Sequence, residues 1–335
     1  GGTDGPSAQV VARGLADRTA RDRGPDRWTV SIPAGMDEST MGQWLEGTGD
    51  YRFAHPNWTV FTTIEPDDPR YGDQWHHPVM QSPQAWDIAT GSTSIISAFV
   101  DTGTFTGHPD LAPNVVPGYN SRDRIAEVDG GVVTDQNGHG THVAGCGAAI
   151  VNNSMGVAGV GWYLGCMSFL CTSASAGGCG GTSLTAFLHG AEWAIENGAS
   201  GSSCSWTGVQ APAVGDSGTY IKSIGGLLLY AADNFGSDHS GFSWPDTIVV
   251  GASNRSDAKA GFSSFGRGVD VFAPGVDILS TLRDGSYGFA SGTSMATPVT
   301  NGVVSLMWSV APTATPEVIQ TLLYTTADDI GAPGF

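Results

Sequence analysis

Short apolar runs alternate with longer segments of helical spacing through most of this 335-residue chain. The apolar runs have the length and composition of buried parallel strands, and they lie at residues 94–100 (SIISAFV), 226–232 (GLLLYAA) and 246–252 (DTIVVGA). The helical segments are residues 140–150, 183–198 and 294–310. This alternation predicts an α/β fold, in which helices cover both faces of a doubly wound, mostly parallel sheet.

The first 64 residues differ from the rest and predict a small α/β unit of their own. We expect helices at Ala8–Arg21 and Glu38–Leu45, and strands at Trp28–Pro33 and Tyr51–Val60. The segment that follows, EPDDPRYGDQW, is rich in Pro and Asp and is typical of an exposed linker. The sequence therefore predicts two domains, residues 1–64 and residues 65–335.

The formal net charge of −18 disfavours two classes of partner. A negative field of this size repels nucleic acids and anionic membrane surfaces. The sequence also lacks any run of 18 apolar residues that could span a bilayer. We therefore expect neither a nucleic-acid partner nor a membrane partner.

The sequence does not determine which of the five cysteines form disulfides. They are Cys146, Cys166, Cys171, Cys179 and Cys204. The odd number leaves at least one thiol unpaired within the chain. Cys171 and Cys179 flank a Gly-rich run and could close a small disulfide loop, but spacing alone leaves this open. The lack of a Cys-x-x-Cys pair argues against a zinc site.

Three segments carry residues suited to hydrolytic chemistry. Asp101 ends the first apolar run, where α/β folds collect their sites, although an Asp there also commonly forms a turn. His139 lies between two glycines just before a helical segment and could serve as a general base. Ser294 begins the last helical segment, either as a cap or as a nucleophile beside a helix N-terminus. We interpret His142, one helical turn after His139, as a packed structural residue rather than a metal ligand.

Each of these residues has an ordinary structural explanation alone, but together they follow the order Asp, His, Ser, as in subtilisin. The motifs around them are VDTG at 100–103, HGTHVAG at 139–145 and GTSMATP at 292–298. Over roughly residues 66–330 the chain resembles the subtilisin-like serine protease (subtilase) family. The resemblance implies a subtilisin-like fold and a secreted, extracellular serine endopeptidase, with Asp101, His139 and Ser294 as its catalytic triad.

The same resemblance implies an oxyanion hole and a substrate-binding segment. GLLLYAADN resembles the family's strand that ends in the oxyanion-hole asparagine, which assigns that role to Asn234. CSWTG resembles the edge strand that pairs with extended substrates, so we expect Ser205, Trp206 and Thr207 to bind substrate. The family usually has Gly at Thr207 and at Asp233. We therefore expect a narrowed primary pocket, beside which the Asp233 carboxylate either favours basic side chains or points to solvent.

A structural calcium site is implied by a further resemblance. The loop VNNSMGV at residues 151–157 resembles the family's high-affinity calcium loop, in its thermitase-like form. Side-chain and backbone oxygens of the kinds that Ca²⁺ prefers would form the site. The expected ligands are Asp68, Asp110, Val151, Asn153, Met155 and Val157. We interpret Asp129 and Asp135 as solvated loop acids.

The N-terminal region and the partners also have expected roles. Residues 1–64 resemble the closing half of the family's propeptide, which acts as a chaperone and inhibitor, with cleavage between about Thr59 and Pro66. We expect a monomer whose partners are this propeptide-like region and protein or peptide substrates. An unrelated N-terminal extension remains the alternative for this region. For the whole chain, the main alternative is a catalytically silent binding protein on a subtilisin fold. An esterase or lipase is disfavoured, because the chain lacks a Gly-x-Ser-x-Gly elbow.

Overall fold

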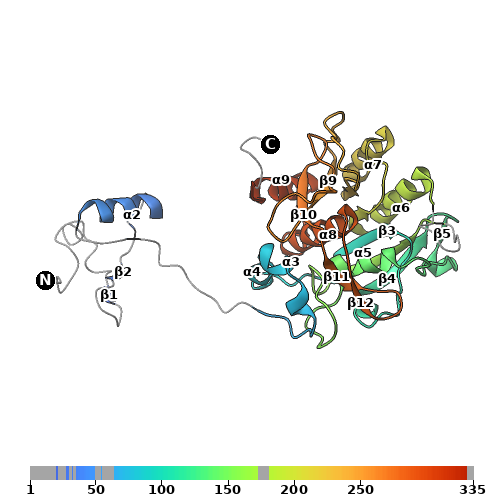
Figure 1. Ribbon diagram of the computed structural model, residues 1–335, viewed down its shortest axis with the longest axis horizontal. Helices are drawn as coiled ribbons and strands as arrows, with labels where there is room; N and C mark the ends of the chain where they lie inside the picture. Colours follow the sequence, from blue (N-terminus) through green and yellow to red (C-terminus); the bar gives the residue numbers. More distant parts are fainter. Residues whose placement is uncertain are drawn as a thin grey trace. The chain divides into compact units, whose positions relative to one another are not determined.

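The computed structural model of this chain describes residues 20–21, 28–29, 32, 35–49, 54, 64–172 and 181–329. The chain divides into two compact units, residues 1–62 and residues 63–335 (Figure 1). Within the described ranges, no helix is both long enough and apolar enough to cross a lipid bilayer.

The N-terminal unit contains a short hairpin and a helix. Strand β1 (Ala20–Arg21) pairs antiparallel with β2 (Trp28–Thr29). Helix α2 (Glu38–Gly47) begins after Asp37, whose carboxylate accepts a hydrogen bond from the amide of Thr40 at 2.8 Å. This contact satisfies one of the free N–H groups of the first helical turn.

In this unit the structure confirms one predicted helix and the start of one predicted strand, but it contradicts the end of the helix predicted at Ala8–Arg21. Helix α2 confirms the helix expected at Glu38–Leu45, and β2 confirms the start of the strand expected from Trp28. Residues 20–21 do not end a helix, because their backbone pairs with β2. The remainder of that expected helix and the expected strand at residues 51–60 lie outside the described residues, apart from Ala54, which belongs to no helix or strand.

One eight-stranded sheet organises the larger unit. Its strands are β3 (Ile96–Asp101), β4 (Val115–Asn120), β5 (Ile125–Ala126), β6 (Gly165–Leu170), β7 (Ala199–Cys204), β8 (Leu227–Ala231), β9 (Thr247–Ser253) and β10 (Val271–Pro274). They lie in the order β10-β9-β8-β7-β3-β6-β4-β5, and only the pair β4–β5 is antiparallel within this described sheet. A separate antiparallel hairpin joins β11 (Ile278–Thr281) to β12 (Tyr287–Ala290). The predicted mostly parallel sheet is confirmed.

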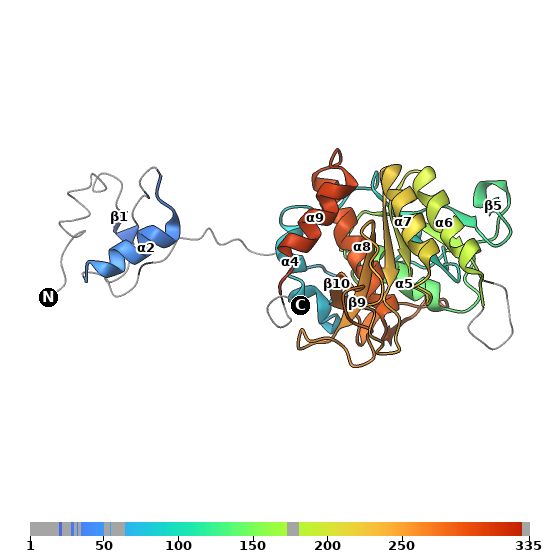
Figure 2. The ribbon, with the colours of Figure 1, turned by 90° about the horizontal axis from the view of Figure 1, so that it is seen from above.

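Helices cover both faces of the sheet (Figure 2). Helices α5 (His139–Ala148) and α8 (Thr293–Val310) pack on one face, and α6 (Leu184–Glu196) and α7 (Pro212–Ser223) pack on the other. The remaining helices are α3 (His76–Val79), α4 (Ser82–Trp86), α9 (Pro316–Thr326) and the short 3-10 turns η2 (Tyr71–Asp73), η3 (Ala112–Asn114) and η4 (Glu127–Asp129). The three helices expected from the sequence are α5, α6 and α8.

Alternate residues of the central strands face opposite layers and form two hydrophobic cores. In β8, Leu227 and Leu229 pack with α5 and α8, whereas Leu228 and Tyr230 pack with α6 and α7. All four side chains are fully buried. Burial on both faces explains why this strand is a continuous apolar run rather than an alternating one.

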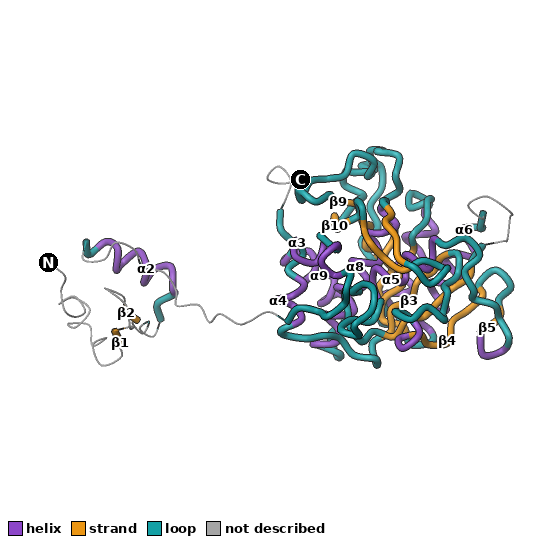
Figure 3. The backbone as a smooth tube through the Cα atoms, turned by 60° about the horizontal axis from the view of Figure 1, so that its bottom comes forward, coloured by secondary structure: helices purple, strands orange, loops and turns teal. Residues whose placement is uncertain are grey.

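The position of β3 explains where a site can form. The chain builds one side of the sheet with β4 and β6, and it then crosses β3 to build the other side from β7 to β10. Such a reversal opens a crevice beyond the carboxyl ends of the strands, where ligands bind in α/β folds. Loops surround the strand ends in this unit (Figure 3), and those after β3, β7 and β8 carry Thr102, Ser205 and Asn234.

Candidate active site

Asp101 lies at the carboxyl end of β3 and is almost completely buried, with 1% of its surface exposed. Its Oδ1 accepts a hydrogen bond from the amide of Thr102 at 2.7 Å and lies 2.7 Å from Nδ1 of His139. Because a carboxylate oxygen only accepts, Nδ1 must carry the proton in this contact. The other ring nitrogen, Nε2, is therefore free to accept a proton from a substrate-side group.

His139 is the first residue of α5, and close packing sets its position. Gly140 lies so near the carbonyl of Gly103 and the side chain of Asp101 that any Cβ there would overlap them. Burial acts to lower the pKa of His139, but the charge of Asp101, its hydrogen bond and the charge of Asp135 together raise that pKa above its ordinary value. The arrangement is that of a general base held by a buried carboxylate.

Two polar side chains of the same segment are structural. Asp135 is 7% exposed and accepts hydrogen bonds from Thr102 Oγ1 at 2.8 Å, from the amide and hydroxyl of Thr141, and from the amides of residues 137 and 138. Our interpretation of Asp135 as a solvated acid is therefore wrong, because its buried carboxylate joins the loop before α5 to Thr102 and Thr141. His142 is buried against the carbonyl of Gly288 at 3.0 Å, as expected of a packed residue, and burial lowers its pKa to about 4.

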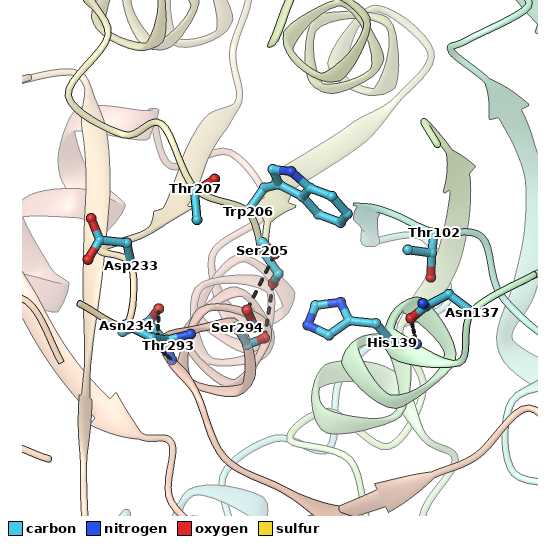
Figure 4. Close-up of a pocket in the computed structure, with 10 residues that line it drawn as sticks. All are labelled: Thr102, Asn137, His139, Ser205, Trp206, Thr207, Asp233, Asn234, Thr293 and Ser294. Atoms are coloured by element: carbon cyan, nitrogen blue, oxygen red, sulfur yellow. Dashed lines mark hydrogen bonds between the residues drawn. The ribbon is translucent and has the colours of Figure 1, made fainter. Parts of the chain in front are cut away.

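Ser294 is the second residue of α8, so its amide is one of the free N–H groups at a helix N-terminus. Figure 4 shows Ser294 between Asn234 and the ring of His139, and its hydroxyl donates to the backbone carbonyl of Ser205 at 3.4 Å. Pro298, inside the helix, lacks the amide that would bond to the Ser294 carbonyl. The hydroxyl of Ser205 donates to that carbonyl instead, at 3.0 Å.

Asn234 follows β8 and directs its amide group towards the start of α8. Its Oδ1 accepts hydrogen bonds from the amide of Thr293 at 2.8 Å and from the Thr293 hydroxyl at 3.1 Å. Both partners are donors, which assigns the oxygen to that side and leaves Nδ2 as a donor. The structure thus brings Nδ2 of Asn234 and the amide of Ser294 to the same pocket (Figure 4).

A cavity of about 180 Å³ joins these groups to the expected substrate segment. Trp206 stands edge-on to the ring of His139, with ring centroids 6.3 Å apart and an interplanar angle of 88°. The carbonyl of Thr207 accepts a hydrogen bond from the buried hydroxyl of Tyr230 at 3.0 Å. Residues 205–207 form no strand here, contrary to the expectation of an edge strand, because no neighbouring strand pairs with them. Their backbone thus follows β7 along one wall of the pocket.

The expected calcium ligands gather at a second place. Asp110 is fully buried, and its two oxygens accept hydrogen bonds from Asn153 Nδ2 at 2.9 Å and from the amide of Val157 at 3.0 Å. Asp68 is 4% exposed and accepts from the amides of Asn152 at 2.7 Å and Asn153 at 3.2 Å. Both carboxylates therefore lie against the loop at residues 151–157. The remaining expected ligands, Val151 and Met155, are part of that loop.

These residues fit a divalent cation on their own chemistry. Burial, followed by the charges of Asp110 and Asp67, raises the pKa of Asp68. Within residues 64–172 and 181–329, neither Asp68 nor Asp110 forms an ion pair with a basic side chain. Gly156 has φ of +42°, and a Cβ there would overlap Asp110. Two buried, mutually repelling carboxylates beside a tightly turned loop have the oxygen-rich character that Ca²⁺ requires.

The described cysteines are buried free thiols. They are Cys146, Cys166, Cys171 and Cys204, whereas Cys179 lies outside the described residues. Burial raises the pKa of Cys146 and of Cys166 to about 12, and it raises the pKa of Cys171 and Cys204 well above the ordinary value. The Sγ of Cys171 donates to the backbone carbonyl of Asp101 at 2.8 Å, so the structure does not contain the suggested Cys171 disulfide.

Comparison with known proteins agrees with this geometry. The sequence profile of the subtilase family matches residues 92–335, more than half of the chain. The chain belongs to the subtilase family. Membership accounts for the order of Asp101, His139 and Ser294, and the protein is a serine peptidase of the subtilisin-like kind rather than a silent binding protein.

Individual subtilases resemble the chain over most of its length. It is 37% identical to thermitase from Thermoactinomyces vulgaris over 277 residues, which cover 80% of this chain and 94% of thermitase. It is 36% identical to an extracellular protease from Xanthomonas campestris over 319 residues, covering 80% of this chain but only 54% of that protein. A solved structure titled as proteases from Pseudoalteromonas arctica matches with a TM-score of 0.70 and 29% identity, covering 80% of this chain and 94% of that one.

Proposed function

We propose that this subtilase is a secreted, calcium-stabilised endopeptidase that cleaves peptide bonds within protein substrates. The observation that carries the proposal is that His139 and Ser294 line one pocket, with Nδ1 of His139 held 2.7 Å from the buried carboxylate of Asp101. Extracellular action is supported by the Xanthomonas relative, which is an extracellular protease. The net charge of −18 suits a soluble protein that avoids anionic surfaces.

The proposed reaction is acyl transfer in two halves. The hydroxyl of Ser294 attacks the peptide carbonyl carbon while Nε2 of His139 takes its proton, and Asp101 stabilises the resulting imidazolium. The tetrahedral oxyanion accepts hydrogen bonds from Nδ2 of Asn234 and from the amide of Ser294, whose helix dipole adds to the stabilisation. His139 then protonates the leaving amine, and the acyl group remains on Ser294.

Water completes the second half along the same path. His139 removes a proton from a water molecule, whose oxygen attacks the acyl carbon. Collapse of the second tetrahedral intermediate releases the carboxylic acid product and returns the proton to Ser294. Apart from water and the buried Asp101, each step uses groups of residues that line the pocket.

The substrate would bind in an extended conformation beside residues 205–207. These residues have no partner strand, so their backbone groups, apart from the Thr207 carbonyl that bonds to Tyr230, can pair with a peptide without demanding a particular sequence. Ser205, Trp206 and Thr207 all line the pocket, and the Thr207 side chain reduces the space that a glycine would leave. We expect this wall to favour small or medium side chains at the position before the cleaved bond.

Calcium would act as a structural ion in this proposal. Asp68, Asp110 and the side chain of Asn153, with the carbonyls of Val151, Met155 and Val157, would hold it. When bound, the ion would neutralise the two buried carboxylates and fix the loop. The catalytic groups belong to other segments, so the ion would support the fold rather than the chemistry.

Residues 1–64 would act as a propeptide, and residues 65–335 as the catalytic domain. Cleavage between about Thr59 and Pro66 would release the catalytic domain from inhibition. The support is the family membership together with the division of the chain into units 1–62 and 63–335. We expect the catalytic domain to act as a monomer on protein substrates.

One experiment tests the proposal. Intact protein and a form clipped near residue 60 would be incubated with a fluorophosphonate probe and with a peptide blocked at both ends, alongside Ser294→Ala. We expect the probe to label Ser294 in the clipped form and the peptide to be cut internally, whereas the variant does neither. Absence of labelling and cleavage in both forms would reject the peptidase. Labelling without internal cleavage would reject only the endopeptidase assignment.

A further inference from the structure

The turn that presents Asn234 has an unusual residue in front of it. Asp233 adopts φ of +69°, in the left-handed region that non-glycine residues seldom occupy, and it is only 5% exposed. Asp233 lines the pocket, and Figure 4 shows its carboxylate directed away from Ser294. Neither expectation for this residue, a charge for basic substrates or a solvated turn, matches its burial.

The carboxylate of Asp233 instead holds the turn together. Its Oδ1 accepts a hydrogen bond from the hydroxyl of Ser264 and another from the amide of Phe235 at 3.1 Å. Its Oδ2 lies 3.0 Å from Nε2 of His239, which is itself 7% exposed. A buried carboxylate with partners on both oxygens is strongly ordered.

His239 closes the other side of the turn. Its Nε2 lies 2.9 Å from the carbonyl of Ala232 as well as 3.0 Å from Asp233. Both neighbours are acceptors, so Nε2 carries the proton and donates to the two of them. The ring packs against Phe242, with centroids 5.2 Å apart, which limits its rotation.

Together these contacts connect the residues on both sides of Asn234. The imidazole contacts Ala232 and Asp233, and the carboxylate contacts Phe235, so the backbone is held immediately before and after Asn234. Asn234 itself is exposed, and among the described residues its side chain bonds only to Thr293. The direction of its Nδ2 therefore depends on a backbone that Asp233 and His239 hold.

We propose that Asp233 and His239 are positioning residues for the oxyanion hole, which aim Nδ2 of Asn234 at the developing oxyanion. This inference rests on the proposed peptidase function. An oxyanion donor contributes only when it lies at hydrogen-bond distance from the transition-state oxygen, so a small displacement of the turn reduces turnover. Substrate binding along residues 205–207 uses other contacts and is not affected.

The variants follow from the contacts. Asp233→Asn keeps a residue that tolerates positive φ, but it places an amide where Oδ2 accepts from His239. His239→Phe removes the donor, whereas His239→Gln retains a side-chain N–H. Asp238→Asn is the matched control, because it removes the same charge from the same loop at an exposed residue. Within the described part of the chain, the Asp238 side chain accepts a hydrogen bond from the Ser240 amide at 2.9 Å and touches neither Asp233 nor His239 by a hydrogen bond.

The test compares kcat and KM for a blocked peptide in single and double variants of the clipped protein. We expect Asp233→Asn and His239→Phe each to lower kcat about 5- to 20-fold with KM changed less than twofold. His239→Gln should recover to within about threefold of wild type, and Asp238→Asn should match wild type. In an Asn234→Ala background, Asp233→Asn should change kcat less than twofold, because the donor that it positions is gone.

The outcomes separate this inference from the proposed function. An inactive wild-type protein would overturn both. An active wild type with unchanged kcat in Asp233→Asn, or with the same loss in the Asn234→Ala background, would overturn only the positioning role. If Asp233→Asn does not fold, as judged by its thermal unfolding, the pair His239→Phe and His239→Gln decides the matter. Equal kcat in that pair would refute the inference.

Discussion

At the scale of single residues, the site depends on a few charges in a buried setting. Asp101 is 1% exposed, and its partner His139 has a raised pKa because nearby carboxylates outweigh burial. A general base works only in its neutral form, so its pKa sets the lower pH limit of activity. The same pair stabilises the folded state below pH 6.5, and this contribution is lost as the pH rises through the raised pKa.

The first prediction concerns this pH limit. We expect kcat/KM of the clipped protein to fall with decreasing pH at a midpoint above 6.5, the ordinary value for histidine. In Asp101→Asn the attracting charge is gone and burial remains, so NMR titration of His139 should give a midpoint below that of wild type. Asp123→Asn, at an exposed carboxylate paired with Arg122, should leave the midpoint unchanged. An equal midpoint in Asp101→Asn would contradict the assignment of Asp101 as the main cause.

The second prediction concerns Asn234. Removing one oxyanion-hole donor costs on the order of 10²–10³ in kcat, a magnitude measured for the corresponding asparagine of subtilisin. We expect Asn234→Ala to show a loss of this size with little change in KM, because the donor acts on the transition state. Steady-state kinetics on the blocked peptide measure both constants. A rise in KM at constant kcat would mean that Asn234 binds substrate rather than the oxyanion.

At the scale of secondary structure, a proline in α8 leaves one helix carbonyl in need of a hydrogen-bond donor from another segment. Pro298 removes an amide from the helix ladder, and the carbonyl of Ser294 is satisfied by the hydroxyl of Ser205, 3.0 Å away on the segment after β7. The nucleophile's own backbone is thereby tied to the wall of the substrate pocket. This hydrogen bond joins the segment after β7 to the start of α8, almost 90 residues later in the sequence, beside the pocket that both segments line.

The third prediction follows from this tie. Ser205→Ala should lower the free energy of unfolding by about 1 kcal/mol, because a partly buried acceptor loses its donor. In a Pro298→Ala background an amide can replace the hydroxyl, so the same change should cost less than half as much. Urea unfolding in a Ser294→Ala background, which prevents self-digestion, measures both values. Equal costs in the two backgrounds would show that the hydroxyl does not replace the missing amide.

The same scale shows what the sequence can and cannot predict. Strands β8 and β9 could be predicted because both of their faces are buried and apolar. Strand β7, with the sequence ASGSSC, could not, because helix α8 packs so closely on it that Asn301 contacts Gly201 and only small side chains fit. The triad motifs could be found in the sequence, but Asp135 bonds to Thr102, 33 residues earlier, and His239 meets Ala232 and Asp233 only because the turn between them folds back. Only the folded structure brings such partners together.

At the scale of the whole molecule, stability depends on the two hydrophobic cores and on the loop at residues 151–157. That loop contacts Asp68 and Asp110, which come from two other parts of the chain. An ion bound there would link three segments that the sheet does not connect directly. Ligands that bind only the folded state stabilise it by about 2.7 kcal/mol at a hundred times their Kd.

The fourth prediction is a calcium-dependent melting temperature. For a domain of this size, 2.7 kcal/mol corresponds to a fall of roughly 5–10 °C in Tm when calcium is removed by a chelator. Asp110→Asn should lower Tm in the presence of calcium and abolish most of the chelator effect. Asp129→Asn, at an exposed acid, should behave like wild type. Calorimetry in a Ser294→Ala background measures these shifts, and an unchanged wild-type Tm on chelation would refute the site.

The burial of four thiols has a consequence for the lifetime of the enzyme. In the native state these sulfurs are shielded and held protonated, so oxidants and alkylating reagents find little to attack. Unfolding returns each of them to an ordinary thiol, which at alkaline pH ionises and couples with its neighbours. Heat damage should thus become permanent sooner in an aerated alkaline solution than in one containing a reductant. The folded state therefore keeps the thiols from the oxidation that would prevent refolding, and this protection ends when the protein unfolds.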